Sequence, residues 1–179
     1  MLFLLDANVL IDAERDYYSF EMVPEFWPWL SHMGELGKVK IPQEVYEEII
    51  SDKDKDKDNN IIYPLSVWAK EPENKKALLL DEDVDIGLVQ KVTLEGYAPD
   101  LTDIGIEKIG RDPFLIAYAL KDLKNRVLVT NESSKPKRVK ANRHIPDVCN
   151  DFSVQSINSF QFVKELGFTT TWESSSSIL

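Results

Sequence analysis

Cysteine is almost absent from this chain, and histidine is scarce. The 179 residues include one cysteine, Cys149, and two histidines. A single cysteine excludes an internal disulfide framework, which is the usual stabilising device of small extracellular proteins. We therefore expect a protein of a reducing compartment, the cytoplasm.

Long apolar runs are missing as well. No stretch of the sequence is long enough to span a bilayer, so we expect no membrane association. Near the N-terminus, Asp6, Asp12 and Glu14 interrupt the apolar pattern, and no basic segment precedes it. Both features disfavour a secretory signal peptide.

Positive charge is in deficit. The chain has 21 Lys and Arg residues and 31 Asp and Glu residues, so its net charge is −10. A strongly acidic protein does not attract nucleic acids through its overall charge. This excludes broad, nonspecific binding but not a nuclease, because carboxylates that hold Mg²⁺ or Mn²⁺ add negative charge, and the bound ion reverses the local field.

The sequence does contain an alternation of strand-like and helix-like segments. Apolar and β-branched runs predict strands over residues 2–5, 38–42 and 126–130. Helical spacing of apolar residues predicts helices over 8–18, 24–37, 43–50, 68–80, 82–97, 112–125 and 156–167. Strands separated by helices imply βαβ units. We therefore predict an α/β fold with three layers, α/β/α, around a mainly parallel central sheet.

The chain length fits a single domain, which we place at residues 1–168. Residues 169–179 are rich in Ser and Thr and predict a loose C-terminal tail. Alternating charges over residues 51–60 predict a solvated loop. Gly34 and Gly37 are predicted to end the second helix.

Acidic residues follow or flank several of the predicted strands. Asp6 ends the first strand, Glu47 and Glu48 lie on the helix after the second, Asp112 opens a helix, and Glu132 follows the strand over 126–130. In parallel sheets, functional sites gather outside the carboxyl ends of the strands. Carboxylates brought together there repel one another unless they are protonated or neutralised. Oxygen-only ligands favour Mg²⁺ or Mn²⁺.

Each of these acids also has an ordinary structural interpretation. Asp112 precedes Pro113 and is a natural helix N-cap. Asp6 can accept hydrogen bonds from the first turn of the next helix, and the two glutamates can form a solvated helix face. Taken singly, the structural interpretation is the stronger one for every acid except Asp6. Their order along the chain, taken together, favours a shared functional role over separate structural ones.

The order and spacing of these segments resemble the PIN-domain nucleases, especially the VapC-like toxins of toxin–antitoxin pairs. The matching segments are FLLDANVLID, IPQEVYEEI, RDPFLIAYAL and RVLVTNE, which together span roughly residues 1–150. In that family they are a strand ending in Asp, a helix carrying Glu, an Asp that opens a helix, and a strand ending in Thr-x-acid. The segment HIPDVC is similar to one in a branch of PIN-like proteins that mostly lack assigned functions.

This resemblance implies a ribonuclease that hydrolyses phosphodiester bonds with Mg²⁺ or Mn²⁺. Asp6, Glu48 and Asp112 would be the core catalytic and metal-binding acids. Glu132 would fill a fourth acidic position, where Asp is usual. Such a metal lowers the pKa of a bound water, which attacks phosphorus in line. This route requires no histidine or cysteine nucleophile.

Two of the implied positions have competitors. Glu47 flanks the buried side of its helix about as closely as Glu48, and Asp147 competes with the acid at position 132 or adds to it. Asn8, Thr130 and Asn131 would orient the acids or touch the substrate.

The basic segment KPKRVKANRH follows the fourth acid and offers Lys135, Lys137 and Arg138 for phosphate contacts, with a solvated loop as the equal alternative. The resemblance further implies an RNA substrate, a protein antitoxin as partner and a homodimer. A non-catalytic PIN-like module that binds RNA or a protein is the main alternative. Arg111 beside Asp112 leaves it open, because an arginine can neutralise the acids and compete with a metal.

Overall fold

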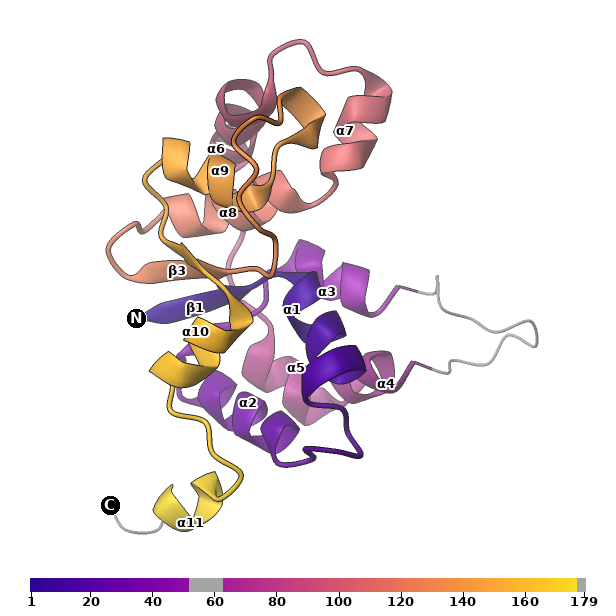
Figure 1. The fold of residues 1–179 in the computed structure, drawn as a ribbon, viewed down its shortest axis with the longest axis vertical. Helices are drawn as coiled ribbons and strands as arrows, with labels where there is room; N and C mark the ends of the chain where they lie inside the picture. Colours follow the sequence, from indigo (N-terminus) through magenta and orange to yellow (C-terminus); the bar gives the residue numbers. More distant parts are fainter. Residues whose placement is uncertain (52–62, 177–179) are drawn as a thin grey trace, which may run out of the picture.

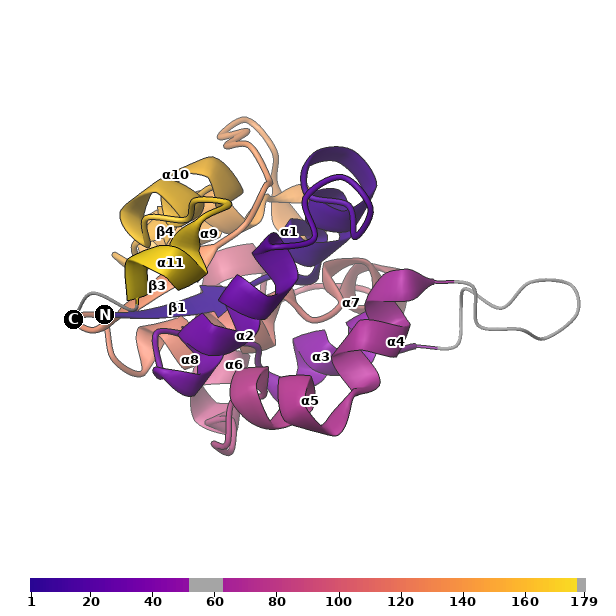
Figure 2. The same ribbon diagram turned by 90° about the horizontal axis from the view of Figure 1, so that it is seen from below.

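The computed structural model describes two ranges of the chain, residues 1–51 and 63–176. Within them, one sheet contains β1 (Leu2–Leu5), β2 (Val39–Lys40), β3 (Arg126–Val129) and β4 (Ser156–Ile157). The strand order is β2-β1-β3-β4, and every pairing is parallel. Helices lie on both sides of the sheet, as Figure 1 and Figure 2 show. The predicted three-layer α/β/α fold is confirmed.

β1 and β3 form the centre of the sheet. Leu2 pairs with Arg126 and Leu5 with Val129, so the two strands end side by side. Leu4 and Leu5 are fully buried, because helices cover the strand on both faces. The residues that follow the two strands, Asp6 and Thr130, therefore meet at the same edge.

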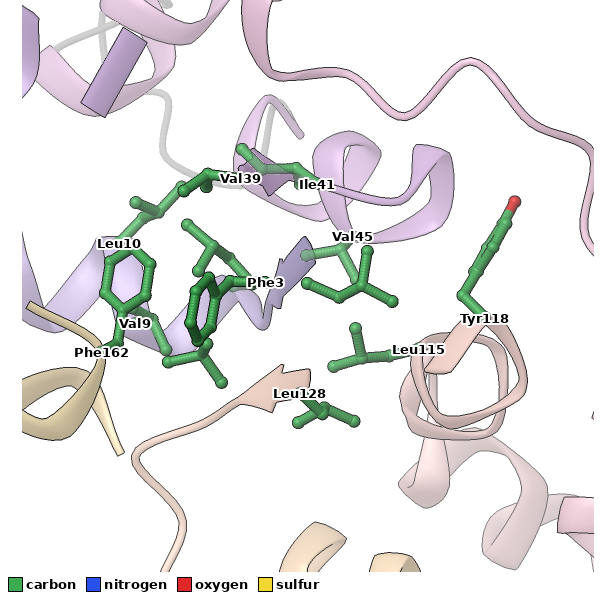
Figure 3. Close-up of a cluster of buried hydrophobic side chains, with 14 of the residues drawn as sticks. Phe3, Val9, Leu10, Val39, Ile41, Val45, Leu115, Tyr118, Leu128 and Phe162 are labelled. Atoms are coloured by element: carbon green, nitrogen blue, oxygen red, sulfur yellow. The ribbon is translucent and has the colours of Figure 1, made fainter. Parts of the chain in front are cut away.

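Apolar side chains fill the space on either side of these strands. The rings of Phe3 and Phe162 meet edge to face, with their centroids 5.5 Å apart. Figure 3 shows this pair beside Val9 and Leu10, with Leu115 at the opposite side of the cluster. The core thus joins residues from both ends of the chain and fixes the strands on which the candidate site depends.

The helices divide between the two faces of the sheet. In Figure 1, α6, α7, α8 and α9 lie on one side, and α1, α2, α5 and α10 on the other. A π-helical segment continues α1 and another continues α6, and a 3-10 turn precedes α9. The bounds of the helical elements are, in chain order, α1 (Ala7–Asp12), η1 (Ala13–Tyr17), α2 (Phe26–Glu35), α3 (Gln43–Ile49), α4 (Pro64–Lys70), α5 (Pro72–Leu78), α6 (Ile86–Lys91), η3 (Val92–Tyr97), α7 (Asp103–Ile109), α8 (Asp112–Leu120), η4 (Lys140–Asn142), α9 (Ile145–Asp151), α10 (Ser159–Glu165) and α11 (Trp172–Ser176).

The segment predicted as one helix over 68–80 is two helices. Lys70 ends α4 and Pro72 begins α5. Glu71 between them is extended, with φ −59° and ψ 131°, because the residue before a proline disfavours the helical region. The charged run predicted to be a loop over 51–60 lies, beyond Ser51, outside the described residues.

Gly34 does not end its helix, contrary to the prediction, but lies within α2. A Cβ atom at this position would lie 2.7 Å from the carbonyl oxygen of Ala77 and 2.8 Å from Leu78. Glycine is therefore required because α5 packs directly against the α2 backbone. Gly37, which has φ +67°, follows the helix as a stop residue should.

The loose tail predicted over 169–179 is also wrong in part, because α11 occupies Trp172–Ser176. The indole Nε1 of Trp172 donates to the carbonyl oxygen of Glu25 at 3.1 Å. Its ring stacks on His32 with centroids 5.3 Å apart. An aromatic anchor thus holds this segment against α2, which a Ser- and Thr-rich composition does not reveal.

Within the described ranges, the longest apolar helices are too short to traverse a bilayer.

The contact at Gly34 generates the first testable prediction. Gly34→Ala forces a methyl group against the Ala77 carbonyl and should lower the free energy of unfolding by about 1–3 kcal/mol. Glu35→Ala, at an exposed position of the same helix, should change it by less than about 0.5 kcal/mol. Urea denaturation followed by circular dichroism measures both. Equal stability of the two variants would contradict the packing described.

Candidate functional site

Asp6 is the first residue after β1 and the N-cap of α1. Its backbone N–H donates to the carbonyl oxygen of Val129 at 3.0 Å, which continues the strand pairing by one residue. The side chain is only 9% exposed. Its Oδ2 atom accepts hydrogen bonds from the Asn8 amide and, at 2.7 Å, from the Thr130 hydroxyl. Asn8 and Thr130 thus orient the Asp6 carboxylate.

Asn131 connects the Asp6 region to two helices. Its backbone N–H donates to Oδ1 of Asn8 at 3.0 Å, and its side-chain amide donates to Asp12 at 2.8 Å. Its own side-chain oxygen accepts the backbone N–H of Ser159 at 3.2 Å. Asn131 therefore holds α1 and α10 to the end of β3 and has a positioning role.

Asp112 begins α8, in front of Pro113. Its Oδ2 atom accepts a hydrogen bond from the Tyr97 hydroxyl at 3.2 Å. The neighbouring Arg111 does not bind this carboxylate: its guanidinium pairs with Glu47 at 3.4 Å. Neutralisation of Asp112 by Arg111, which the sequence left open, is therefore not what the structure shows.

The four acids singled out from the sequence act on one another electrostatically. Burial, followed by the charges of Glu132 and Glu48, raises the pKa of Asp6 to about 7, against the Thr130 hydrogen bond that lowers it. Burial, followed by the charges of Asp6, Glu132 and Glu48, raises the pKa of Asp112 to about 8. Glu48, from an exposed position, and Glu132, from a half-buried one, thus act through their charges on the carboxylates of Asp6 and Asp112.

Helix α3 brings two glutamates to this edge of the sheet. The carboxylate of Glu47 accepts a hydrogen bond from the Gln43 amide at 3.0 Å and pairs with Arg111. Glu48 is the one whose charge raises the pKa of both Asp6 and Asp112. Of the two, Glu48 is therefore the one whose charge acts on Asp6 and Asp112, although both line the same cleft.

Glu132 also holds the start of α9. Its Oε2 atom accepts the backbone N–H of Ile145 at 2.7 Å and lies 3.9 Å from Nδ1 of His144. An aspartate is one methylene shorter and would not reach this backbone group in the same position. Glutamate in place of the usual aspartate therefore has a physical reason. Its longer side chain bonds the first residue of α9, while its charge still raises the pKa of Asp6 and Asp112.

Asp147 occupies a different place. One carboxylate oxygen accepts the Ser134 hydroxyl at 2.5 Å, and the other accepts the backbone N–H of Lys135 at 2.7 Å. Both oxygens are thus engaged in holding the loop after β3 against α9. Asp147 is a loop anchor, and this engagement argues against the competing ligand role that the sequence left open.

Two clefts open beside Asp112. One of about 590 Å³ is lined by Glu48, Arg111 and Lys108, among others. The other, of about 260 Å³, is lined by Glu132, Arg138 and Lys108 together with Asp112 itself. Asp112 therefore lies where an extended ligand crossing from one cleft to the other would pass.

The basic segment after β3 contributes unequally to these clefts. Arg138 lines the smaller one. Lys140 pairs with Asp100 at 2.5 Å, and Arg143 pairs with Asp151 at 2.7 Å. Lys137 is exposed, and Lys135 is also exposed and meets Asp147 through its backbone. Of the three predicted phosphate contacts, Arg138 is the one that the fold brings to the acids.

Among the residues that the structure describes, no three Asp, Glu, His or Cys side chains converge closely enough to form a ready-made metal site. The cluster is therefore an electrostatic neighbourhood of carboxylates whose side chains would have to move closer to share an ion. Its donor atoms are all oxygens, the type that Mg²⁺ and Mn²⁺ prefer.

Sequence reasoning missed Tyr97 and Lys108. Tyr97 ends a helical pattern 15 residues before its partner Asp112, and only the packing of η3 against α8 brings them together. Lys108 lines both clefts. No local signal in the sequence distinguishes Tyr97 and Lys108 from other tyrosines and lysines.

The raised pKa values predict how the stability of the metal-free protein depends on pH. The ordinary pKa of 3.8 for Asp6 and Asp112 applies to the unfolded chain. Between about pH 4 and pH 8 the folded state holds protons that the unfolded state has released, so stability falls as pH rises. Asp112→Asn should therefore stabilise the protein, by about 1–3 kcal/mol at pH 8 and by less at pH 5.

Urea denaturation in EDTA at both pH values measures this difference. Asp100→Asn is the matched control, because Asp100 is exposed and Lys140 lowers its pKa. The control should give no gain at pH 8. An Asp112→Asn protein no more stable than the wild type at pH 8 would refute the buried, charge-coupled carboxylate.

Comparison with known proteins yields one assignment. No curated protein and no solved structure matches the chain. A family model described as a domain of unknown function (DUF4411) matches residues 3–170, a range that begins within β1, extends beyond α10 and includes all of the acids described above. The chain therefore belongs to the DUF4411 family.

Proposed function

We propose that this protein is a ribonuclease that hydrolyses RNA phosphodiester bonds with the help of Mg²⁺ or Mn²⁺. One observation carries the proposal: Asp6, Glu48, Asp112 and Glu132 come from four separate segments and act on one another at the carboxyl edge of a parallel sheet. Asp6 is buried and Asp112 half-buried, and within the described part of the chain neither forms an ion pair with a cation, which costs stability. Structural capping alone requires neither this burial nor this grouping.

The acids fit a hard divalent cation by their chemistry. All four offer carboxylate oxygens, and the pKa of Asp6 and of Asp112 is raised by burial and by negative neighbours, a state that a cation relieves. Asp6, Glu48 and Asp112 would hold the ion, with Glu132 as the fourth acid. When bound, such an ion supplies Lewis acidity and a water molecule of lowered pKa.

The residues around the acids have separate tasks in this proposal. Asn8 and Thr130 hold Oδ2 of Asp6, so the carboxylate keeps one orientation. Glu48 and Glu132 line different clefts on the two sides of Asp112. A strand of RNA that follows both clefts would place one phosphodiester beside Asp112.

The charge distribution supports a phosphate-bearing ligand. Among the described residues, Arg138 makes no side-chain ion pair, in contrast to Arg111, Lys140 and Arg143. Together with Lys108 it brings positive charge to a cleft that Asp112 and Glu132 also line. A phosphate next to the cleaved one would gain from this arginine.

The resemblance to VapC-like toxins extends the proposal to partners. A protein antitoxin would cover the acidic edge, and a homodimer would be the assembled form. Both partners remain predictions from the resemblance.

Cleavage of RNA tests the proposed activity. Purified protein is incubated with tRNA and ribosomal RNA in Mn²⁺, Mg²⁺ or EDTA, and the products are mapped by primer extension. We expect discrete, metal-dependent cuts that Asp6→Asn and Asp112→Asn each reduce by about 100-fold or more. Asp100→Asn, at an exposed acid away from the cluster, should cut like the wild type.

A thermal shift on adding Mn²⁺ separates the proposal from its alternative. An intact site is stabilised by the ion it binds. Absence of cleavage together with absence of any Mn²⁺-dependent shift would refute the metal site. Because no three acids of the described residues already converge, that result would favour a non-catalytic module that keeps the fold and binds RNA or a protein.

Substitution of single basic residues tests the RNA path. Arg138→Ala should weaken binding of a fluorescein-labelled single-stranded RNA and lower the slope of log affinity against log salt by about 1. Lys137→Ala removes the same charge from an exposed position not seen in the cleft and should have a clearly smaller effect. Fluorescence anisotropy in Ca²⁺ over a range of salt concentrations measures both, and equal losses would refute the role of the Arg138 cleft.

A further inference from the structure

We propose that Tyr97 is a positioning residue for Asp112, and that η3 belongs to the active site through this contact. The proposal rests on the function proposed above and extends it to a residue outside the four acids. It is carried by the hydrogen bond from the Tyr97 hydroxyl to Oδ2 of Asp112, at 3.2 Å, and by the way the fold holds Tyr97 in place.

Tyr97 is buried, although its hydroxyl is polar. Only 5% of the residue is exposed, and it is part of the hydrophobic core. A buried tyrosine hydroxyl needs a hydrogen-bond partner, and here the partner is the carboxylate at the start of α8. The phenol can donate to that carboxylate, which fixes its side-chain rotamer and leaves Oδ1 free of this bond.

The π-helical form of η3 sets the position of Tyr97. The backbone N–H of Ala98 donates to Thr93 five residues earlier, at 3.1 Å, which is the wide pattern of a π-helix. Such segments are rare and occur often at functional sites. This one ends at Tyr97, so the extra residue in the turn rotates the tyrosine relative to the α6 helix that precedes it.

Gly96 lets η3 pack directly onto α9. A Cβ atom at position 96 would lie 2.7 Å from Val148 and 2.8 Å from Phe152. The guanidinium of Arg143 also bonds the Gly96 carbonyl oxygen. The same arginine bonds the carbonyl of Asp147 at 3.1 Å. Arg143 thus clamps Gly96, the residue before Tyr97, to α9, which fixes the backbone on the N-terminal side of the tyrosine.

The arrangement has a chemical consequence. Asp112 lies between negative neighbours and, without a neutral donor, would avoid the cluster or rotate away from it. A donor at Oδ2 stabilises the ionised carboxylate and keeps it at the boundary of the two clefts. Outer partners of this kind orient a ligating carboxylate and account for about 10–100-fold in metal affinity or activity.

Tyr97→Phe removes only the hydroxyl and is compared with Tyr118→Phe. Tyr118 is the matched control because it is buried, lies on α8 itself, and donates to a backbone carbonyl, that of Glu82, at a similar 3.2 Å. Binding of Mn²⁺ is followed by electron paramagnetic resonance, and thermal unfolding is measured in EDTA. We expect Tyr97→Phe to weaken Mn²⁺ binding by about 10-fold or more, and Tyr118→Phe to leave it unchanged.

A double-mutant cycle isolates the contact. In the Asp112→Asn background, Tyr97→Phe should cause no further loss of Mn²⁺ affinity, because its effect passes through Asp112. With an RNA that the wild type cuts, Tyr97→Phe should lower kcat while KM stays within about 2-fold. Arg143→Gln is a second variant, which removes the clamp on Gly96 and should weaken Mn²⁺ binding in the same direction.

The outcomes separate the two proposals. If the wild type binds Mn²⁺ and Tyr97→Phe binds it as tightly as Tyr118→Phe does, the positioning role is wrong and the proposed function stands. The same holds if Tyr97→Phe weakens binding equally with and without Asp112. If the wild type binds no Mn²⁺ and cuts no RNA, the proposed function fails, and the role of Tyr97 fails with it.

Discussion

The burial of a carboxylate at the end of β1 is the constraint on which the rest of the site depends. Asp6 is nearly inaccessible to solvent, and burial is the largest cause of its raised pKa. A carboxylate removed from water is costly unless other groups satisfy it. Asn8 and Thr130 satisfy one oxygen, so the end of β1, the start of α1 and the end of β3 are held together by one buried acid.

Parallel strand pairing explains why segments far apart in the chain meet there. β1 and β3 end in register, and α1, α3 and α8 each begin at this edge of the sheet (Figure 1). α1 and α3 follow β1 and β2, whereas α8 precedes β3. Asp6 and Asp112 stand at two of these helix starts, so the fold brings them into one neighbourhood without a long loop, although no three acids of the described residues converge on one point. The same geometry also raises the repulsion among them, which a hard cation would relieve.

The surroundings of the acids divide into groups that hold the fold and groups that face the clefts. Asp147 and Asn131 use their polar atoms to tie loops to helices. Glu132 belongs to both groups. It accepts a hydrogen bond from the N-terminus of α9, and its negative charge raises the pKa of Asp112. Tyr97 links the two groups, because its ring belongs to the core and its hydroxyl reaches Asp112. Acids that lie close together in this region therefore have different roles: some hold the fold and others face the clefts.

The sequence by itself determined the fold class and the central strands, because periodicity is a local signal, and it singled out the four acids as candidates from their strand-end and helix positions. It also indicated Asn8 and Thr130, whose neighbours along the chain carry the pattern. Only the tertiary structure paired Glu47 with Gln43 and Arg111, made Asp147 a loop anchor and brought Tyr97 to Asp112. It likewise placed Gly34 against α5 and folded Trp172 onto α2. Each of these depends on contacts between residues distant in sequence, where packing and burial, rather than local preference, set the partner of a side chain.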